Sequence, residues 1–558
     1  MTRIPNQARR AGLLLVALPA VVVAVLPLVY TVLRGTDQGW AAVWRYATSA
    51  RTAELAGNTF LLLAAVTAAS VALGTGTAFL LARTDLPGVP VLLPLLAMPL
   101  AIPSYVAAFS WLSHFPELAG FTGSWLVLTA SNTPLVLLPV YAALRAADGG
   151  PEEVARSLGA GAVRTFGTVT VAQIRLPLLA GALLGALYVL NDYGAVAMMR
   201  YETFTKGIDY AYNASFDRTA ANVISLVLVV IALVFAAGEL VARGKVATRV
   251  GAGTARPASV RPLGVARLPA LLAVTALVAV SVLMPLGGLL PWLTGPGTGT
   301  PEMTEVLAAL RNTVGFSGTA ALLTVLIALP VGIMAARSRG LFARAIELTA
   351  YAGYALPGIS VGLALVYFGI NTVPAWYGHG QLVVLAYIAL FLPISIGATR
   401  AAVAASGPQL EEVARSLGST GFTAAARVTV PLAAPGITAG AALVFLSCAK
   451  ELPATLILQP AGQNTLALEL WKHTEVVHYT QAAWYGLILV VVAVLPTIAL
   501  QRVAGRTSAR RSQGEDDAIP TVPPLSTGPV PIGPAAVAGP ASDGPLEVAV
   551  SGRRVRSE

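Results

Sequence analysis

Carboxylate side chains at four places in this chain are spaced so that they could bind a cation or stabilise a helix end. Two acidic pairs lie in charged segments between long apolar runs, and two single acids lie late within such runs. The pairs are Glu152-Glu153 and Glu411-Glu412, and the single acids are Asp192 and Glu451. A carboxylate can bind a hard cation through oxygen, or it can stabilise the positive end of a helix. The single acids therefore suit a cation path, and the pairs suit the start of a short helix.

An exact repeat relates these residues to one another. The octapeptide Glu152–Gly159 recurs without change as Glu411–Gly418, 259 positions later. The same register aligns Asp192 with Glu451, and it continues without a gap. It also aligns Val169-Thr170-Val171 with Val428-Thr429-Val430, and Ala180-Gly181-Ala182 with Ala439-Gly440-Ala441. Eight identical residues in one register are hard to reach by chance. The repeat predicts two copies of one membrane unit, each presenting the same polar element to the same side.

Other reactive residue types give little indication of a site. Cys448 is the only cysteine, so no internal disulfide can form and no zinc site is expected. The four histidines have no metal-ligand spacing beyond His473-x₄-His478, and we interpret them as solvated loop residues. They are His114, His379, His473 and His478. No Gly-x-x-x-x-Gly-Lys-Ser/Thr loop occurs, so the chain itself is expected to lack an ATP site. We expect no catalytic residue, no resident metal and no cofactor.

Composition assigns the chain to a class. Apolar residues make up 56% of its 558 residues and charged residues 11%, and mean hydropathy is +0.74. A soluble domain carries about 25% charged residues, whereas many runs here exceed the roughly 18 apolar residues that span a bilayer. We expect an all-α polytopic membrane protein in a lipid bilayer. The net charge of +10 comes from basic residues beside apolar runs, so it indicates membrane orientation and no nucleic-acid partner.

The apolar runs predict about twelve spans in two homologous halves of six. In the first half, 1–242, they lie near 11–33, 55–82, 91–113, 122–144, 176–199 and 221–242. In the second half, 269–506, they lie near 269–293, 312–336, 346–370, 381–403, 432–458 and 483–503. The basic segment 243–268 is predicted to be a flexible linker. The segment 507–558, rich in Pro, Gly, Ser and Ala, is predicted to be a disordered tail.

Basic residues orient these spans. Arg3, Arg9 and Arg10 precede the first span, which is too long for a cleaved signal core, so we expect an uncleaved anchor with a cytoplasmic N-terminus. That start places 243–268 and the C-terminal tail in the cytoplasm, in agreement with the excess of Lys and Arg in cytoplasmic loops. Both octapeptides then also lie inside. The predicted location is the plasma membrane, with both termini cytoplasmic.

Each octapeptide is predicted to form a short amphipathic helix. Glu152 and Glu153 follow Gly149-Gly150-Pro151, and carboxylates and proline both suit the first turn of a helix. Val154 and Leu158 then form one apolar stripe, and Gly159 ends the helix. The second copy repeats this pattern. A helix lying on lipid is one interpretation, but two unchanged copies, each between the fourth and fifth spans of its half, favour docking to a symmetric partner.

These motifs resemble those of a known family. Glu-x-Ala-x-x-x-Gly followed by Val-Thr-Val-Pro is similar to the "EAA" loop of permease subunits of ATP-binding-cassette importers. The matching residues are Glu153, Ala155 and Gly159, and Glu412, Ala414 and Gly418. The second loop, near 407–431, keeps the family's proline at Pro431. The first loop, near 148–172, has Ala172 there and its proline later, at Pro177.

Further stretches resemble one branch of this family. Leu190–Val196 with Thr203-Phe204-Thr205, and Lys450–Leu456 with Asn464-Thr465-Leu466, resemble the fused, two-unit permeases of ferric-iron importers. Relatives of this architecture also carry thiamine, phosphonate or polyamine. The resemblance implies the fold of a type I importer permease. It also implies two partners: a separate ATPase, in two copies, that docks Glu152, Glu153, Ala155, Gly159, Glu411, Glu412, Ala414 and Gly418, and an extracytoplasmic substrate-binding protein.

Asp192 and Glu451 allow two interpretations. Acids within spans usually face a bundle interior or a cavity, so the pair fits a shared path for a hard cation. The alternative is that both lie at the membrane surface and only end their helices. At the level of the whole chain, the rival class is a secondary transporter driven by an ion gradient, which also has repeats and buried acids but needs no repeated cytoplasmic docking loop.

Overall fold

The computed structural model of this chain describes residues 6–247, 260–295, 299–337, 353 and 356–494. Within these ranges it contains helices and no β-strand. Nine of the described helices are long and apolar enough to cross a membrane, and a bent pair makes a tenth. Two shorter apolar helices, Gly358–Thr372 and Tyr479–Val494, lie where the two remaining spans were predicted. The predicted all-α polytopic class is confirmed.

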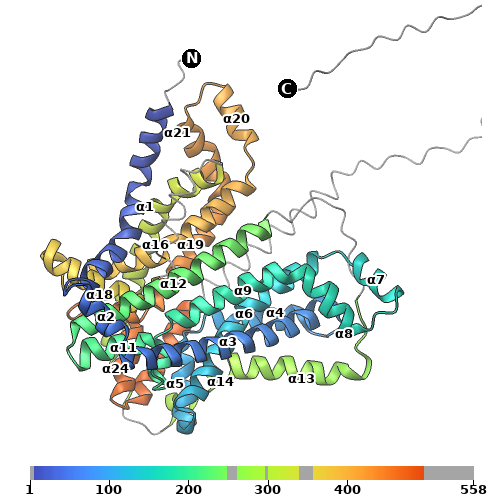
Figure 1. The fold of residues 1–558 in the computed structure, drawn as a ribbon, viewed down its shortest axis with the longest axis horizontal. Coiled ribbons are helices and arrows are strands. Elements are labelled where there is room, and N and C mark those ends of the chain that lie inside the picture. Colours follow the sequence, from blue (N-terminus) through green and yellow to red (C-terminus); the bar gives the residue numbers. More distant parts are fainter. Residues whose placement is uncertain (1–5, 248–259, 296–298, 338–352, 354–355, 495–558) are drawn as a thin grey trace, which may run out of the picture. The chain divides into compact units, whose positions relative to one another are not determined.

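Each half is built on the same sequence of long helices (Figure 1). In the first half these are α1 (Asn6–Gly35), α3 (Ala50–Arg83), α6 (Phe121–Ala146), α9 (Val171–Asn191) and α12 (Arg218–Ala247). In the second half they are α13 (Arg267–Val278), α16 (Met303–Arg337), α19 (Gly380–Ala405), α22 (Val430–Ala449) and the helix Tyr479–Val494, while α18 (Gly358–Thr372) corresponds to the shorter α5 (Ser104–His114). Ser49 begins α3 by accepting a hydrogen bond from the N–H of Thr52 (3.2 Å). In both halves the tightest helix packing joins equivalent pairs, α3 with α6 and α16 with α19.

The first helix of each half packs against the other half. Ala17, Ala20 and Ala24 of α1 are buried against α16 and α19, in a cluster with Ala328, Val331, Met334, Leu392 and Ile396. The second half's α13 lies against α4 (Val89–Ala97) of the first half. Small alanine side chains let α1 approach its neighbours closely. The two repeats are therefore units of sequence, whereas their packing is interleaved.

Three predicted spans are interrupted rather than continuous. The span predicted at 91–113 is bent by 94° between α4 with its 3₁₀ turn and α5 (Ser104–His114). The span predicted at 176–199 breaks at Asp192 before α10 (Gly194–Met198), and that predicted at 432–458 breaks at Lys450–Leu452 before α23 (Pro453–Leu458). Pro103 disfavours the helical conformation of the residue before it, and Pro453 has no N–H with which to continue the hydrogen bonding of α22. Apolarity alone did not reveal these breaks.

The segment joining the halves is held in place where the structure describes it. Arg261 pairs with α3 through its backbone: its N–H donates to the carbonyl of Arg83 (2.9 Å), and its own carbonyl accepts from the N–H of Asp85 (3.2 Å). The N–H of Leu263 donates to the carboxylate of Asp85 (2.8 Å). The predicted linker thus ends docked on α3. Its residues 248–259 and the predicted tail 507–558 lie outside the described residues.

Candidate functional site

The two octapeptides form matching short helices, α7 (Gly150–Ser157) and α20 (Gln409–Ser416). Each is followed by one turn of α-helix, α8 (Ala162–Thr165) or α21 (Gly421–Ala424). A π-helical segment comes next, Phe166–Thr170 or Ala425–Thr429, and leads into the long helix. α9 and α22 begin at equivalent positions, so the exchange of Pro431 for Ala172 does not move the start of the helix. We call the segments 148–172 and 407–431 the docking loops.

A glycine in a left-handed conformation ends each short helix. Gly159 has φ +83° and Gly418 has φ +93°. The chain reversal lets the N–H of Ala160 donate to the carbonyl of Ala155 (3.0 Å), as Ser419 does to Ala414 (3.1 Å). This is the Schellman arrangement, which favours glycine because it lacks a Cβ. It also gives Ala155 and Ala414, both motif residues, a defined place in the loop.

The apolar stripes of the docking loops point away from the protein. Leu158 and Leu417 are each 82% exposed. Val154, Val163, Leu410, Val413 and Phe422 are also exposed. Glu153 and Glu412 are exposed beside them. Apolar side chains gathered on a charged loop are typical of a surface that another protein covers. Each docking loop therefore offers an apolar patch with a carboxylate next to it.

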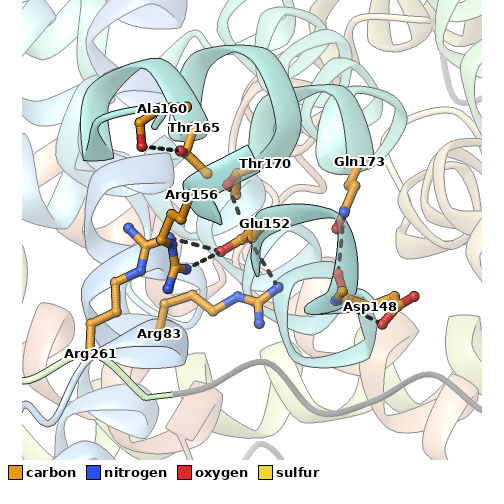
Figure 2. Close-up of polar contacts among 10 residues, drawn as sticks. Arg83, Asp148, Glu152, Arg156, Ala160, Thr165, Thr170, Gln173 and Arg261 are labelled. Atoms are coloured by element: carbon orange, nitrogen blue, oxygen red, sulfur yellow. Dashed lines mark hydrogen bonds and ion pairs between the residues drawn. The ribbon is translucent and has the colours of Figure 1, made fainter. Parts of the chain in front are cut away.

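Glu152 has a different position from its neighbour Glu153, because its side chain is only 2% exposed. Figure 2 shows its carboxylate at the centre of a polar cluster. Oε1 accepts a hydrogen bond from Thr170 (2.9 Å) and lies 3.6 Å from Nη2 of Arg83. Oε2 accepts from Arg261 (2.8 Å) and Arg156 (3.2 Å). The carboxylate thus joins the docking helix to the π-helical segment, to α3 and to the segment between the halves.

The second docking loop repeats the core of this arrangement. Oε2 of Glu411 accepts a hydrogen bond from Thr429 (3.0 Å) and lies 3.2 Å from Nε of Arg337 at the end of α16. Arg337 also donates to the carbonyl of Gly407 (2.7 Å). Thr170 and Thr429 are aligned by the repeat, and Arg83 and Arg337 each end an equivalent helix. The first glutamate of each motif is therefore an internal anchor, and the second is the exposed one.

This division of roles predicts different outcomes for two neighbouring substitutions. Glu152→Gln leaves the buried Arg83 guanidinium, 3% exposed, without its acid, and loss of one partner of a buried ion pair costs about 3–5 kcal/mol. We expect a lower melting temperature and faster proteolysis within 148–172. Glu153→Gln, the matched control, is expected to change neither. Equal stability and equal cleavage of the two variants would contradict the anchoring role of Glu152.

Asp192 and Glu451 line one cavity of about 360 Å³, together with residues from both halves. Its polar and charged lining residues are Ser104, Tyr105, Tyr188, Asn191, Asp192, Tyr193, Ser447, Lys450 and Glu451. Both acids lie where a long helix is interrupted, so the breaks turn side chains and free backbone groups toward the cavity. Irregular backbone within a membrane is tolerated where it lines such a space.

Each of these carboxylates also caps the short helix that follows it. Oδ1 of Asp192 accepts from the N–H of Ala195 (2.9 Å), and its Oδ2 accepts from the hydroxyl of Ser104. Oε1 of Glu451 accepts from the N–H of Ala454 (3.0 Å). Both acids thus lie at helix ends, and both face a cavity lined by residues of the two halves. A role in transport stays a prediction.

The four histidines were predicted to be solvated loop residues. In the part of the chain that the structure describes, no group of three His, Cys, Asp or Glu side chains is placed to hold a metal ion. His473 stacks on Tyr485, with ring centroids 5.4 Å apart, and lies 3.6 Å from the carboxylate of Glu469. Burial lowers the pKa of His473 below its usual value despite this acid. The side chain is therefore packed rather than fully solvated.

The sequence of this chain is similar to those of known transport proteins. Residues 328–512 match the family described as "Binding-protein-dependent transport system inner membrane component". Over 484 residues the chain is 35% identical to the Fe(3+)-transport system permease protein FbpB 2 of Haemophilus influenzae, covering 86% of this chain and 96% of the relative. The chain belongs to this family of importer permeases. The resemblance inferred from the docking-loop motifs is confirmed.

Other relatives match shorter parts of the permease. A molybdenum transport system permease protein, ModB, of Mycobacterium bovis is 31% identical over 221 residues, 37% of this chain and 80% of the relative. A putative 2-aminoethylphosphonate transport system permease protein, PhnV, of Salmonella typhimurium is 27% identical over 161 residues, 29% of this chain and 61% of the relative. The permease is thus an inner-membrane transport component that works with a binding protein and an ATPase, and its relatives are permeases rather than enzymes.

Several residues of the site were not singled out from the sequence. The anchors Thr170 and Thr429 lay in the repeat alignment, but nothing in their type indicated a bond to a glutamate. Arg83 and Arg337 are basic residues at the ends of predicted spans, a position that is common for orientation charges and indicates no partner. Lys450 is next to Glu451 in the sequence, but it donates to the carbonyl of Leu100 in the other half (2.8 Å). These contacts are long-range in sequence, so local pattern does not reveal them.

Proposed function

We propose that this chain is the permease of an ATP-driven importer of ferric iron. The observation that carries the proposal is identity across nearly the whole of a relative named for Fe(3+) transport. The relatives named for molybdenum and 2-aminoethylphosphonate transport match less than half of this chain. The cavity lining supports the same choice, because two carboxylates favour a hard cation and repel an oxyanion. Thiamine, phosphonate and polyamine are the alternative cargoes.

Coupling to ATP is proposed to run through the docking loops. Each loop offers an exposed apolar stripe and one exposed carboxylate, Glu153 or Glu412, to one copy of the ATPase. Two loops on one chain suit two ATPase copies and a single permease chain. The anchors Glu152, which is buried, and Glu411, which is partly buried, tie each docking helix to the end of a long helix, α3 or α16. Movement of the ATPase copies toward each other is thereby passed to the spans. A gradient-driven carrier would have no use for such loops.

The orientation we propose has both docking loops and both termini in the cytoplasm. The basic segment 243–268 motivates it. In a variant whose single native Cys448 is replaced by serine, cysteines at 255 and 515 are expected to react with an impermeant maleimide only after the membrane is opened. A cysteine at 210 is expected to react in intact cells. Labelling of position 255 in intact cells would overturn the orientation and the docking proposal with it.

The cargo is tested through the binding protein. The complex of permease and ATPase in lipid nanodiscs is mixed with the cognate binding protein loaded with Fe³⁺, or with the same protein freed of iron and offered molybdate, phosphonate, thiamine or spermidine. We expect ATP hydrolysis to be stimulated by the ferric form and not by the others. Stimulation by another cargo, with none by the ferric form, would replace iron by that cargo.

A further inference from the structure

We propose that Lys450 is a tethered counter-cation of the cavity, and that it holds the two halves together there until a cargo cation takes its place. The proposal rests on the proposed function for the sign of the cargo's charge. Its evidence is a set of contacts across the cavity, the charges of the cavity wall and a difference between the two repeats.

The contacts of Lys450 cross from the second half to the first. Its Nζ donates a hydrogen bond to the carbonyl of Leu100 (2.8 Å), the last residue of the 3₁₀ turn Met98–Leu100. In return, the hydroxyl of Tyr105 donates to the carbonyl of Lys450 (3.3 Å). Leu100 and Tyr105 lie on either side of the 94° break between α4 and α5. Lys450 itself lies in the break between α22 and α23, so two interrupted spans are joined at this residue.

The charges of the cavity wall give the ammonium a second role. Among the described residues that line the cavity, Asp192 and Glu451 are the acids and Lys450 is the one base. Two unbalanced carboxylates in a membrane interior are costly, and one nearby ammonium offsets part of that cost. The ammonium donates to a carbonyl, and no ion pair of the described residues joins it to either acid within 4.0 Å. Both carboxylates are thus left able to attract a further cation.

The repeats differ at this position. The register that aligns Asp192 with Glu451 aligns Asn191 with Lys450. Asn191 also lines the cavity, and its Oδ1 has no hydrogen-bond partner in the part of the chain that the structure describes. The first half therefore lacks both the charge and the crossing bond. Only the second repeat therefore makes this contact. The substitution Lys450→Asn gives the second repeat the residue that the first repeat has at this position.

A cation that enters the cavity acts on this contact. It supplies the positive charge that the two carboxylates need, and it repels the ammonium at short range in a medium of low dielectric constant. Both effects weaken the bond from Nζ to Leu100. Arrival of cargo and separation of the halves are thereby linked, since a cargo that does not carry positive charge would leave the contact intact.

The test measures ATP hydrolysis by the complete complex in nanodiscs, with and without the ferric binding protein. Lys450→Asn is expected to raise the basal rate roughly two- to tenfold, the range for loss of a net hydrogen-bond contribution, and to lower the stimulation ratio. Lys450→Arg keeps a charged hydrogen-bond donor at this position, so its basal rate of ATP hydrolysis is expected to stay as low as that of the parent. Thr438→Ala changes an exposed residue of α22 that does not line the cavity and bonds only to carbonyls of its own helix, and it serves as the control. Tyr105→Phe removes the returning bond without changing charge and is expected to give a smaller increase.

The outcomes separate this proposal from the proposed function. Unchanged basal rates in both Lys450→Asn and Tyr105→Phe would overturn the contact, even if the ferric binding protein still stimulates the parent complex. If Lys450→Arg behaves like Lys450→Asn, the ammonium charge is not what matters and the proposal fails. If the ferric form stimulates no complex but Lys450→Asn still raises the basal rate, the contact stands and the iron assignment falls. Should Lys450→Asn fail to insert, Tyr105→Phe and Lys450→Arg decide.

Discussion

Replacing Gly159 and Gly418 together by leucine is expected to abolish stimulated ATP hydrolysis and transport while the permease still inserts into the membrane. Both glycines have positive φ, where a residue with a Cβ costs about 1–2 kcal/mol. A Cβ at either position meets no atom of the permease within 4 Å, so the leucine side chain would project from the surface offered to the ATPase. Each docking helix would also lose the left-handed glycine that ends it.

The matched control for this variant is Gly39→Leu. Gly39 has φ +80° and equally open surroundings, but it precedes α2 (Trp40–Ala47) at the far end of α1 from the docking loops. Co-purification of the ATPase and its stimulation by the loaded binding protein are the measurements. The single variants are expected to differ, with Gly418→Leu more damaging, because its loop keeps the family's proline. Normal stimulation in the double variant would remove the loops from the coupling mechanism.

Asp192→Asn combined with Glu451→Gln is expected to lower uptake of ferric iron per inserted molecule by at least about tenfold, the effect of losing about 1.4 kcal/mol of favourable interaction. The double variant changes the charge but keeps the capping hydrogen bonds, because the side-chain oxygens of Asn and Gln still accept from the N–H groups of Ala195 and Ala454. What changes is charge. The cavity wall goes from two acids and one base to one base alone, which repels a cation.

Each single variant is expected to be less impaired than the double, since the remaining carboxylate still attracts the cation. Co-purification of the ATPase is expected to be unchanged in all three, because the cavity lies along the spans and not at the docking loops. If the double variant takes up iron normally per inserted molecule, Asp192 and Glu451 are helix caps and nothing more.

The sequence predicted well those features that depend on local composition. Apolar runs located the spans, and the unchanged octapeptide located both docking helices and their glycine ends. The sequence did not separate Glu152 from Glu153, because adjacent residues of one type differ only by about 100° of helix rotation. Which of them is buried depends on Arg83 and Arg261, which lie far away in the chain.

The sequence also did not reveal the interrupted spans and the interleaved first helices. Asp192 and Glu451 were expected within continuous spans, and the breaks beside them are what bring both to one cavity. Mean hydropathy does not distinguish a straight helix from a broken one of equal composition. The packing of α1 on α16 and α19 is decided by complementary small side chains, for which one sequence offers no pairing rule.

The central claim is that this permease carries ferric iron when the ATPase bound at its docking loops hydrolyses ATP. The most direct test is uptake of radiolabelled Fe³⁺ into sealed proteoliposomes that contain the permease and its ATPase, with the ferric binding protein on the outer side and ATP enclosed. We predict uptake that requires all three proteins and ATP, and that is lost in the Gly159→Leu, Gly418→Leu double variant. Uptake that continues without ATP, or that follows an imposed ion gradient instead, would contradict the account.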